Sequence, residues 1–187
     1  MVPQPHVRPR TRLNAEKLEA RVTPAFGDLL RTFTDPTPVP GGEFASSVAA
    51  SGNIAVVGSI NETVNGQGGA GAVHVYDLAS GGLLRTIPNP DPAPDDDFGT
   101  VVALDGNILV VGVPNDDGAG GTSSGSAYVF DVTTGNLLHW LHDTAPQVLD
   151  NFGTSVAVSG NRVAVGNPKR QPQWFRRRWL GVRLRCD

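Results

Sequence analysis

The chain has 187 residues, a net charge of −3, 23 glycines, 15 prolines and one cysteine. This length suits one ordinary domain, and no apolar run approaches the 18 residues that a membrane-spanning helix needs. Because Cys186 is the only cysteine, neither a disulfide framework nor a cysteine metal site can be built. The many glycines and prolines favour short strands joined by turns.

Charge is distributed unevenly along the chain. Residues 32–168 contain 14 acidic residues, whereas Arg85 and Arg162 are their only basic ones. Six basic residues lie in residues 1–31 and seven in residues 169–187, so an acidic middle stands between two basic ends. The acidic middle argues against nucleic acid as the partner of that region.

Residues 1–27 form a basic leader that we expect to be largely disordered, with a helix-capable segment at residues 13–21. The leader lacks the apolar core of an ordinary secretion signal. Its pattern resembles a short leader at the start of large repeat-bearing bacterial surface proteins, which implies export, and the residues that carry it are Arg12-Leu13-x-x-Glu16-x-Leu18-Glu19-x-Arg21-x-x-Pro24-Ala25. A disordered basic arm is the open alternative.

A tandem repeat with a period of 54 residues runs from about residue 28 to residue 168. Three short motifs recur in the three copies at a constant spacing, without insertion or deletion. The first is Phe44-Ala45, Phe98-Gly99 and Phe152-Gly153. The second is Ser51-Gly52-Asn53, Asp105-Gly106-Asn107 and Ser159-Gly160-Asn161, and the third is Val57-Gly58, Val111-Gly112 and Val165-Gly166. Structure and function are therefore expected to follow the repeat.

The second copy shows the predicted strands most clearly. Residues 98–104 and 108–112 flank Asp105-Gly106-Asn107, a turn signal that predicts a hairpin. Residues 126–132 form a third β-branched and aromatic run, and a fourth begins at Leu137. Each repeat is therefore predicted to hold four antiparallel strands, named A to D in chain order.

This pattern predicts an all-β fold made of β-propeller-type blades, each with four antiparallel strands. A helical solenoid is excluded because no window sustains a period of 3.6 residues. We expect strand D to come first, near Leu29–Phe33, followed by two full blades and part of a third. About two and a half blades make an incomplete ring, whose open edges invite self-association.

The Phe-Gly pairs and the Val-Gly-x-Pro elements at residues 111–114 and 165–168 resemble the FG-GAP repeat of integrin α-subunit propellers and many bacterial surface proteins. The resemblance covers residues 28–168 and implies a non-enzymatic, exported or cell-surface module for adhesion or ligand recognition. Calcium-binding members carry an Asp-rich loop between these two elements. Here that place holds a three-residue turn, which argues against calcium in the family's usual position.

The long loops are expected to share one face, because successive strands alternate in direction. They are residues 59–71 and 113–125, which join strands B and C, and residues 88–97, which join strand D to the next strand A. Such a face is where a protein or carbohydrate ligand of unknown identity would bind. The loops contain Asp91 and six candidate calcium ligands, Asp95, Asp96, Asp97, Asn115, Asp116 and Asp117. A solvated acidic surface is the favoured alternative, since neither residues 115–118 nor residues 61–66 show the alternating ligand pattern of a calcium loop.

No nucleophile elbow, phosphate-binding loop, zincin signature or dinucleotide glycine pattern occurs, so we predict no catalysis. No partner for any of the four histidines can be identified from the sequence. Residues 131–135 followed by Trp140 are similar to the tryptophan-docking motif of quinoprotein propellers, although Trp140 lies one residue late. A quinoprotein-like redox or assembly propeller is therefore the alternative function. Packing of Trp140 on the outer strand is the favoured interpretation of this residue.

Residues 169–187 form a basic tail with three aromatic residues, for which nucleic-acid or anionic-membrane binding is a third hypothesis. If the codons are read one nucleotide later from Gln171 on, codon degeneracy allows positions 179–186 to encode the same amino acids as residues 125–132, which lie one period of 54 residues earlier. We hypothesise that a frameshift, either in the gene or introduced in reading the gene, replaced strand C of the third blade. A truncated, non-functional fragment of a larger protein is then an open alternative to the recognition module. Resequencing the nucleotides for residues 165–187 tests this hypothesis.

Overall fold

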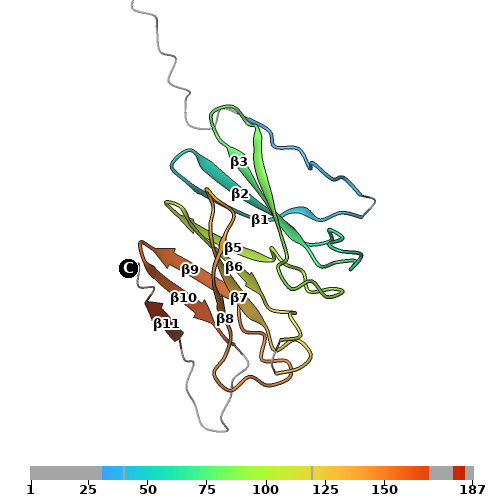
Figure 1. Ribbon diagram of the computed structural model, residues 1–187, viewed down its shortest axis with the longest axis vertical. Coiled ribbons are helices and arrows are strands. Elements are labelled where there is room, and N and C mark those ends of the chain that lie inside the picture. Colours follow the sequence, from blue (N-terminus) through green and yellow to red (C-terminus); the bar gives the residue numbers. More distant parts are fainter. Residues whose placement is uncertain (1–30, 40, 119, 169–178, 184–187) are drawn as a thin grey trace, which may run out of the picture. The chain divides into compact units, whose positions relative to one another are not determined.

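The computed structural model describes residues 31–39, 41–118, 120–168 and 179–183 (Figure 1). Every regular element in these ranges is a β-strand, and the strands form three antiparallel sheets without a helix. Strand pairing does not close these sheets into a ring. The predicted all-β class with an incomplete ring is therefore confirmed. The leader and its helix-capable segment lie outside the described residues.

The first sheet is a four-stranded meander in chain order. Its strands are β1 (Phe44–Ser51), β2 (Ile54–Ser59), β3 (Ala72–Asp77) and β4 (Leu83–Pro88). Gly52 adopts a φ of 58° in the tight turn between β1 and β2, as the turn signal predicts. Strands β2 and β3 are almost entirely buried, because both faces of these central strands are covered.

The second sheet repeats the first with a displacement of 54 residues. Its strands are β5 (Val101–Asp105), β6 (Ile108–Val113), β7 (Ser126–Asp131) and β8 (Leu137–Leu141). The register is also conserved between copies, since Val57 pairs with His74 and Val111 pairs with Tyr128. Because the repeat length is constant, equivalent residues of the two copies pair in the same register. The four predicted strands of the second copy are confirmed.

The third sheet contains β9 (Ser155–Ser159), β10 (Arg162–Gly166) and β11 (Trp179–Arg183), in the order β11-β10-β9. Strand β11 occupies the place of strand C, although its sequence differs from that of β3 and β7. Its register is displaced by two residues, because Gly166 pairs with Trp179 where the second sheet implies residue 181. Residues 169–178 and 184–187 lie outside the described part, and the frameshift remains a hypothesis.

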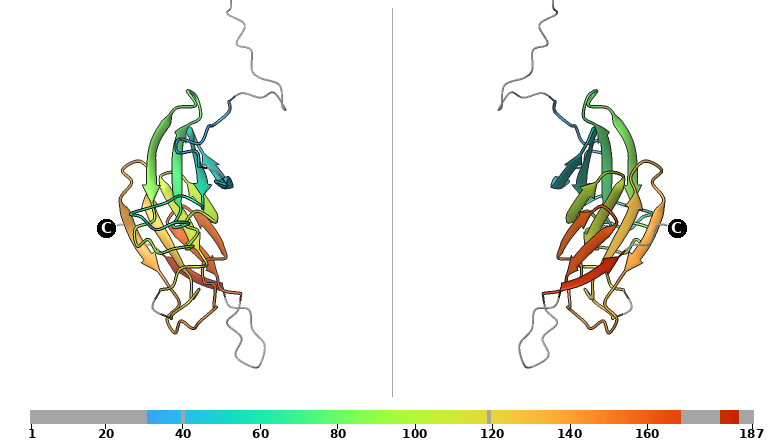
Figure 2. Two further views of the ribbon diagram at one scale, coloured as in Figure 1. Left: turned by 90° about the vertical axis from the view of Figure 1, so that its right-hand side faces the viewer. Right: turned by 90° about the vertical axis from the view of Figure 1, so that its left-hand side faces the viewer.

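The sheets pack face to face, and the core lies between them (Figure 2). One cluster joins Val56, Val73 and Val75 of the first sheet to Phe98 and Leu109 of the second repeat. Another joins the second sheet to the third around Phe152, Val163 and Val165. This face-to-face arrangement is the one expected of successive propeller blades.

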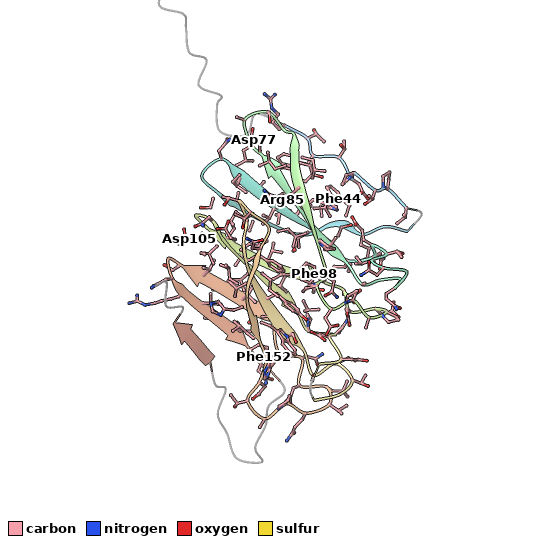
Figure 3. All side chains as sticks on the ribbon, in the orientation of Figure 1. Phe44, Asp77, Arg85, Phe98, Asp105 and Phe152 are labelled. Carbon is pink, nitrogen blue, oxygen red and sulfur yellow. The ribbon has the colours of Figure 1, made fainter. Side chains whose placement is uncertain are left out.

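A phenylalanine recurs near the start of strand A in each repeat, and Figure 3 labels these residues as Phe44, Phe98 and Phe152. Phe98 is fully buried, and its ring centroid lies 5.8 Å from that of Tyr128 and 6.0 Å from that of Phe130. Aromatic pairs at these separations add stability beyond their buried area. Phe98 therefore connects the start of strand A to strand C of the same sheet.

The glycines of the Phe-Gly and Val-Gly pairs allow neighbouring sheets to approach closely. A Cβ added to Gly58 would lie 2.1 Å from the carbonyl oxygen of Gly99, and one added to Gly112 would lie 2.1 Å from that of Gly153. Ser47 Oγ donates to the same Gly99 oxygen at 2.6 Å. The two glycine pairs of the repeat therefore meet across each junction, where no side chain fits.

Arginine side chains tie each of the first two sheets to the segment that precedes it. Arg85 of β4 donates at 2.5 Å to the Thr134 carbonyl, in the turn between β7 and β8. Arg31, one period earlier, donates at 2.8 Å to the Ala79 carbonyl in the matching turn of the first sheet. Residues 31–33 form no strand, and Leu29 and Leu30 lie outside the described residues. Arg31 nevertheless makes the contact that a preceding strand D would make.

Ala45 stands where the other copies have glycine, and its φ is 66°. A left-handed conformation costs alanine about 1 kcal/mol relative to glycine. We expect Ala45→Gly to raise the free energy of unfolding by about 1 kcal/mol, as measured by urea denaturation. Ala49→Gly, in the extended part of β1, is the control and should destabilise. Equal effects of the two substitutions would contradict the prediction.

Candidate functional site

The long loops meet at one edge of the sheets and bind each other through backbone groups. Asp95, Asp97 and Phe98 donate backbone N–H bonds of 2.9–3.1 Å to the carbonyls of Gly68, Gly69 and Ala70. Leu149, Asn151 and Phe152 repeat this pattern on Thr122, Ser123 and Ser124. The loop from strand D to strand A is thus fastened to the preceding B–C loop, which gives the loop face a defined backbone.

The candidate calcium ligands lie on this face, but several of their oxygens already accept hydrogen bonds. Asp97 accepts from Asn115 Nδ2 at 2.7 Å, and Asp117 accepts from the Ser123 N–H at 2.8 Å. Asp116 is buried and accepts from Tyr128 Oη at 2.9 Å. These bonds hold the loops in shape, and calcium binding by these residues stays a prediction.

Asp96 is fully buried beneath the loop face. It accepts hydrogen bonds from Asn89 Nδ2 at 2.8 Å and from the Ala93 N–H at 2.7 Å. Burial raises the pKa of Asp96 from 3.8 to about 6, and the nearby charge of Asp116 acts in the same direction. Asp96 therefore binds a proton more readily in the folded chain than in the unfolded chain.

This raised pKa predicts a pH-dependent loss of stability. The pKa of Asp96 is higher in the folded chain than in the unfolded chain. Its contribution to the free energy of unfolding is therefore fully present below pH 4 and is lost as the pH rises to about 6. We expect the free energy of unfolding of Asp96→Asn, relative to that of the wild type, to increase by on the order of 1 kcal/mol between pH 4 and pH 7. Urea denaturation across this range measures the difference. A difference that stays constant with pH would contradict the prediction.

His74 has partners that the sequence did not reveal. Its ring is fully buried on β3, with Nε2 2.5 Å from Glu62 Oε1 and Nδ1 2.9 Å from Thr86 Oγ1. Burial raises the pKa of Glu62, but hydrogen bonds from His74 and Thr37 and the charge of His74 outweigh it. The net pKa of Glu62 is therefore below its usual 4.5.

The same pair of positions is polar in both complete repeats. Glu62 and His74 correspond, at a displacement of 54, to Asp116 and Tyr128. Burial, followed by the charge of Asp116, raises the pKa of Tyr128, so its hydroxyl stays protonated and donates to that carboxylate. Aligning the copies position by position could have revealed the Glu62–His74 pair, because a carboxylate and a polar ring recur 12 residues apart.

Asp35 lies beside this pair. Among the described His, Cys, Asp and Glu side chains, the ligand atoms of three converge within 4.8 Å at one place, formed by Asp35, Glu62 and His74. Thr37 connects the two carboxylates, since its N–H donates to Asp35 at 2.8 Å and its hydroxyl to Glu62 at 2.8 Å. This cluster, here called the Asp35 cluster, contains none of the residues predicted to bind metal.

Trp140 packs within its own sheet. Its ring is stacked on Tyr128 with a centroid separation of 6.4 Å, and its Nε1–H donates to Ser126 Oγ at 3.0 Å. Trp140, the residue on which the similarity to the tryptophan-docking motif depends, therefore extends from strand β8 and packs on strand β7.

The fold and the recurring Phe-Gly junctions define a chain of β-propeller-type repeats. A family model described as the FG-GAP repeat matches residues 34–76 and 85–130. The chain therefore carries two FG-GAP repeats, as the resemblance implied, and the matched ranges contain strands β1–β3 and β5–β7. No curated protein matches the chain.

Two solved structures are similar to part of this chain. One is the computationally designed Ika8 protein, 25% identical, with a TM-score of 0.45 over 65% of this chain and 30% of that chain. Another is a chain of the Mitotic Checkpoint Complex, 23% identical, with a TM-score of 0.45 over 71% of this chain and 32% of that chain. The present chain thus spans about a third of the length of either. In the ranges that the structure describes, no helix has the length and apolarity to cross a membrane.

Proposed function

We propose that this protein is a non-enzymatic, exported or cell-surface repeat module that recognises a protein or carbohydrate ligand through its acidic loop face. The observation that carries the proposal is the fastening of the loops, since each D–A loop is held to the preceding B–C loop by backbone hydrogen bonds. A face with a fixed backbone presents its side chains to a partner at little cost in conformational entropy.

Exposed carboxylates on this face are available to a ligand. Asp91, Asp95 and Asp117 are exposed, whereas Asp96 and Asp116 are buried and form internal hydrogen bonds. The face therefore divides into an internal polar layer and an outer acidic layer. The outer layer suits a ligand with cationic or hydrogen-bond-donating groups.

The proposal is tested by comparing two charge-matched triple variants of the full chain. Protein and carbohydrate arrays first identify a ligand, and its affinity is then measured by calorimetry. Asp91→Asn, Asp95→Asn and Asp117→Asn together should weaken binding by about tenfold or more. The control combines Asp77→Asn, Asp105→Asn and Asp131→Asn at the turn end of the sheets, and it should leave affinity unchanged.

Two results would overturn this function. If both triple variants bind alike, the loop face is not the recognition surface. If the full chain is retained inside cells that produce it, as measured by fractionation, the export part of the proposal fails.

A further inference from the structure

We propose that the Asp35 cluster binds one divalent transition-metal ion, with Asp35, Glu62 and His74 as its three protein ligands and Zn²⁺ as the best-matched ion. The three ligand atoms lie within 4.8 Å of one another, so side-chain adjustments can bring them to the separations of about 3.4 Å that a tetrahedral ion with bonds of about 2.1 Å requires. The site differs from the acidic loop candidates in its residues, and it does not depend on the proposed recognition function.

The surroundings of His74 orient its ring for a ligand role. In the metal-free chain Nε2 lies 2.5 Å from Glu62 Oε1 and donates its proton to it, while Thr86 Oγ1 lies 2.9 Å from Nδ1. A metal ion would displace the Nε2 proton, and Thr86 Oγ1 can then accept the Nδ1 proton. Metal-binding histidines usually donate their second ring N–H to a neighbouring acceptor in this manner, which fixes the tautomer and the ring. Ring contacts with Phe44 and Tyr76, at centroid separations of 5.8 Å and 6.5 Å, add to this restraint.

Both carboxylates are also held in place. Thr37 donates its backbone N–H to Asp35 and its hydroxyl to Glu62, so one residue fixes the two groups relative to each other. In the metal-free chain the Nε2 proton of His74 lies between the ring and the Glu62 carboxylate, and a metal ion would take the place of this proton. A bound ion would widen the 2.5 Å separation between Nε2 and Oε1 to about 3.4 Å, which follows from tetrahedral bonds of about 2.1 Å.

The second repeat shows how the same position is satisfied without a metal. Asp35, Glu62 and His74 correspond there to Asn89, Asp116 and Tyr128. The phenol of Tyr128 supplies its own proton to Asp116 at 2.9 Å, and Asn89 donates to Asp96. An amide replaces the Asp35 carboxylate and a protonated phenol replaces the His74 imidazole, so the metal site is specific to the first repeat.

The ligand types select the class of metal. Imidazole with two carboxylates suits Zn²⁺ and related transition-metal ions, whereas Ca²⁺ and Mg²⁺ prefer oxygen ligands alone. The His74 side chain is fully buried, the Glu62 side chain is 12% exposed, and Asp35 is partly exposed. The cluster thus opens to solvent on its carboxylate side, where an ion can enter and water can complete the coordination.

The test uses the full chain with Cys186→Ser, so that no thiol competes for the metal. Zn²⁺ is titrated in competition with a chromophoric chelator, and Co²⁺ binding is followed by visible absorption. We expect one Zn²⁺ per chain, a Co²⁺ spectrum of low-coordinate type, and loss of both in His74→Gln. Asp35→Asn changes a partly exposed residue that does not hold the core, so it tests the ligand set if His74→Gln fails to fold.

Two further variants separate a metal site from a merely polar cluster. Thr86→Val removes the acceptor for Nδ1 and should weaken Zn²⁺ binding by about 10- to 100-fold without removing a ligand. His139→Gln, a histidine outside the cluster, should leave both affinity and stoichiometry unchanged.

Three outcomes would overturn the proposal. The first is the absence of Zn²⁺ binding by the Cys186→Ser chain, with NMR of His74 showing a proton on both ring nitrogens. The second is Zn²⁺ binding that survives both Asp35→Asn and His74→Gln. The third is equal retention of Ca²⁺ and Zn²⁺, which would indicate an unselective acidic surface.

Discussion

Replacing Gly112 by alanine should lower the free energy of unfolding by about 3 kcal/mol, because the added methyl group has no space at the junction between the second and third sheets. Its Cβ would lie 2.1 Å from the Gly153 carbonyl oxygen. This obstacle is backbone, so it cannot rotate away as a flexible side chain would. The sheets must separate, and the core around Phe152 and Val165 opens with them.

Gly68→Ala is the matched control for this experiment, since a Cβ there meets nothing within 4 Å. We expect the control to change stability by about 0.5 kcal/mol or less. Urea denaturation monitored by circular dichroism compares the two variants with wild type. If Gly112→Ala costs no more than Gly68→Ala, the close approach of the two backbones is wrong.

Replacing Phe98 by alanine should cost about 4 kcal/mol of unfolding free energy, the largest effect that we expect from a single side chain in this protein. Phe98 is fully buried in the cluster that joins the first two sheets, and its ring contacts both Tyr128 and Phe130. Its removal leaves a cavity between sheets whose backbones are fixed by the glycine contacts. Such a cavity cannot collapse, so the cost should lie toward the upper end of the usual range.

Phe44→Ala provides the comparison, because Phe44 occupies the same repeat position but is only half-buried. Its cost should be about 2 kcal/mol. Thermal or chemical denaturation of both variants tests the ranking. Equal losses for Phe44→Ala and Phe98→Ala would show that burial between sheets is not what stabilises the repeat.

The strands of the two complete repeats could be predicted because their signals are local. A turn signal such as Asp105-Gly106-Asn107 sets the hairpin, and the 54-residue period carries the same register into both sheets. Strand β11 could not be predicted in this manner, since residues 179–183 lack the sequence pattern that β3 and β7 share. Its position follows from pairing with the free edge of β10, which is a non-local property.

The candidate site was only partly accessible from sequence. Alternation of strand direction placed the long loops on one face, but it gave no information about which carboxylates are buried. Asp96 and Asp117 look equivalent in the sequence, although one lies beneath the loops and the other is exposed. The Asp35 cluster joins three segments with no local motif, and only comparison between copies indicates it.

The junctions between sheets have a consequence for the gene. Ser51 Oγ accepts from the Gly106 N–H, and one period later Asp105 Oδ2 accepts from the Gly160 N–H. In both pairs the two residues are 55 positions apart. Gain or loss of one whole repeat by unequal crossing-over would therefore place equivalent residues opposite each other at the new boundary. Gain or loss of any other length would separate these pairs, so a constant copy length preserves the contacts between sheets even where the residues differ.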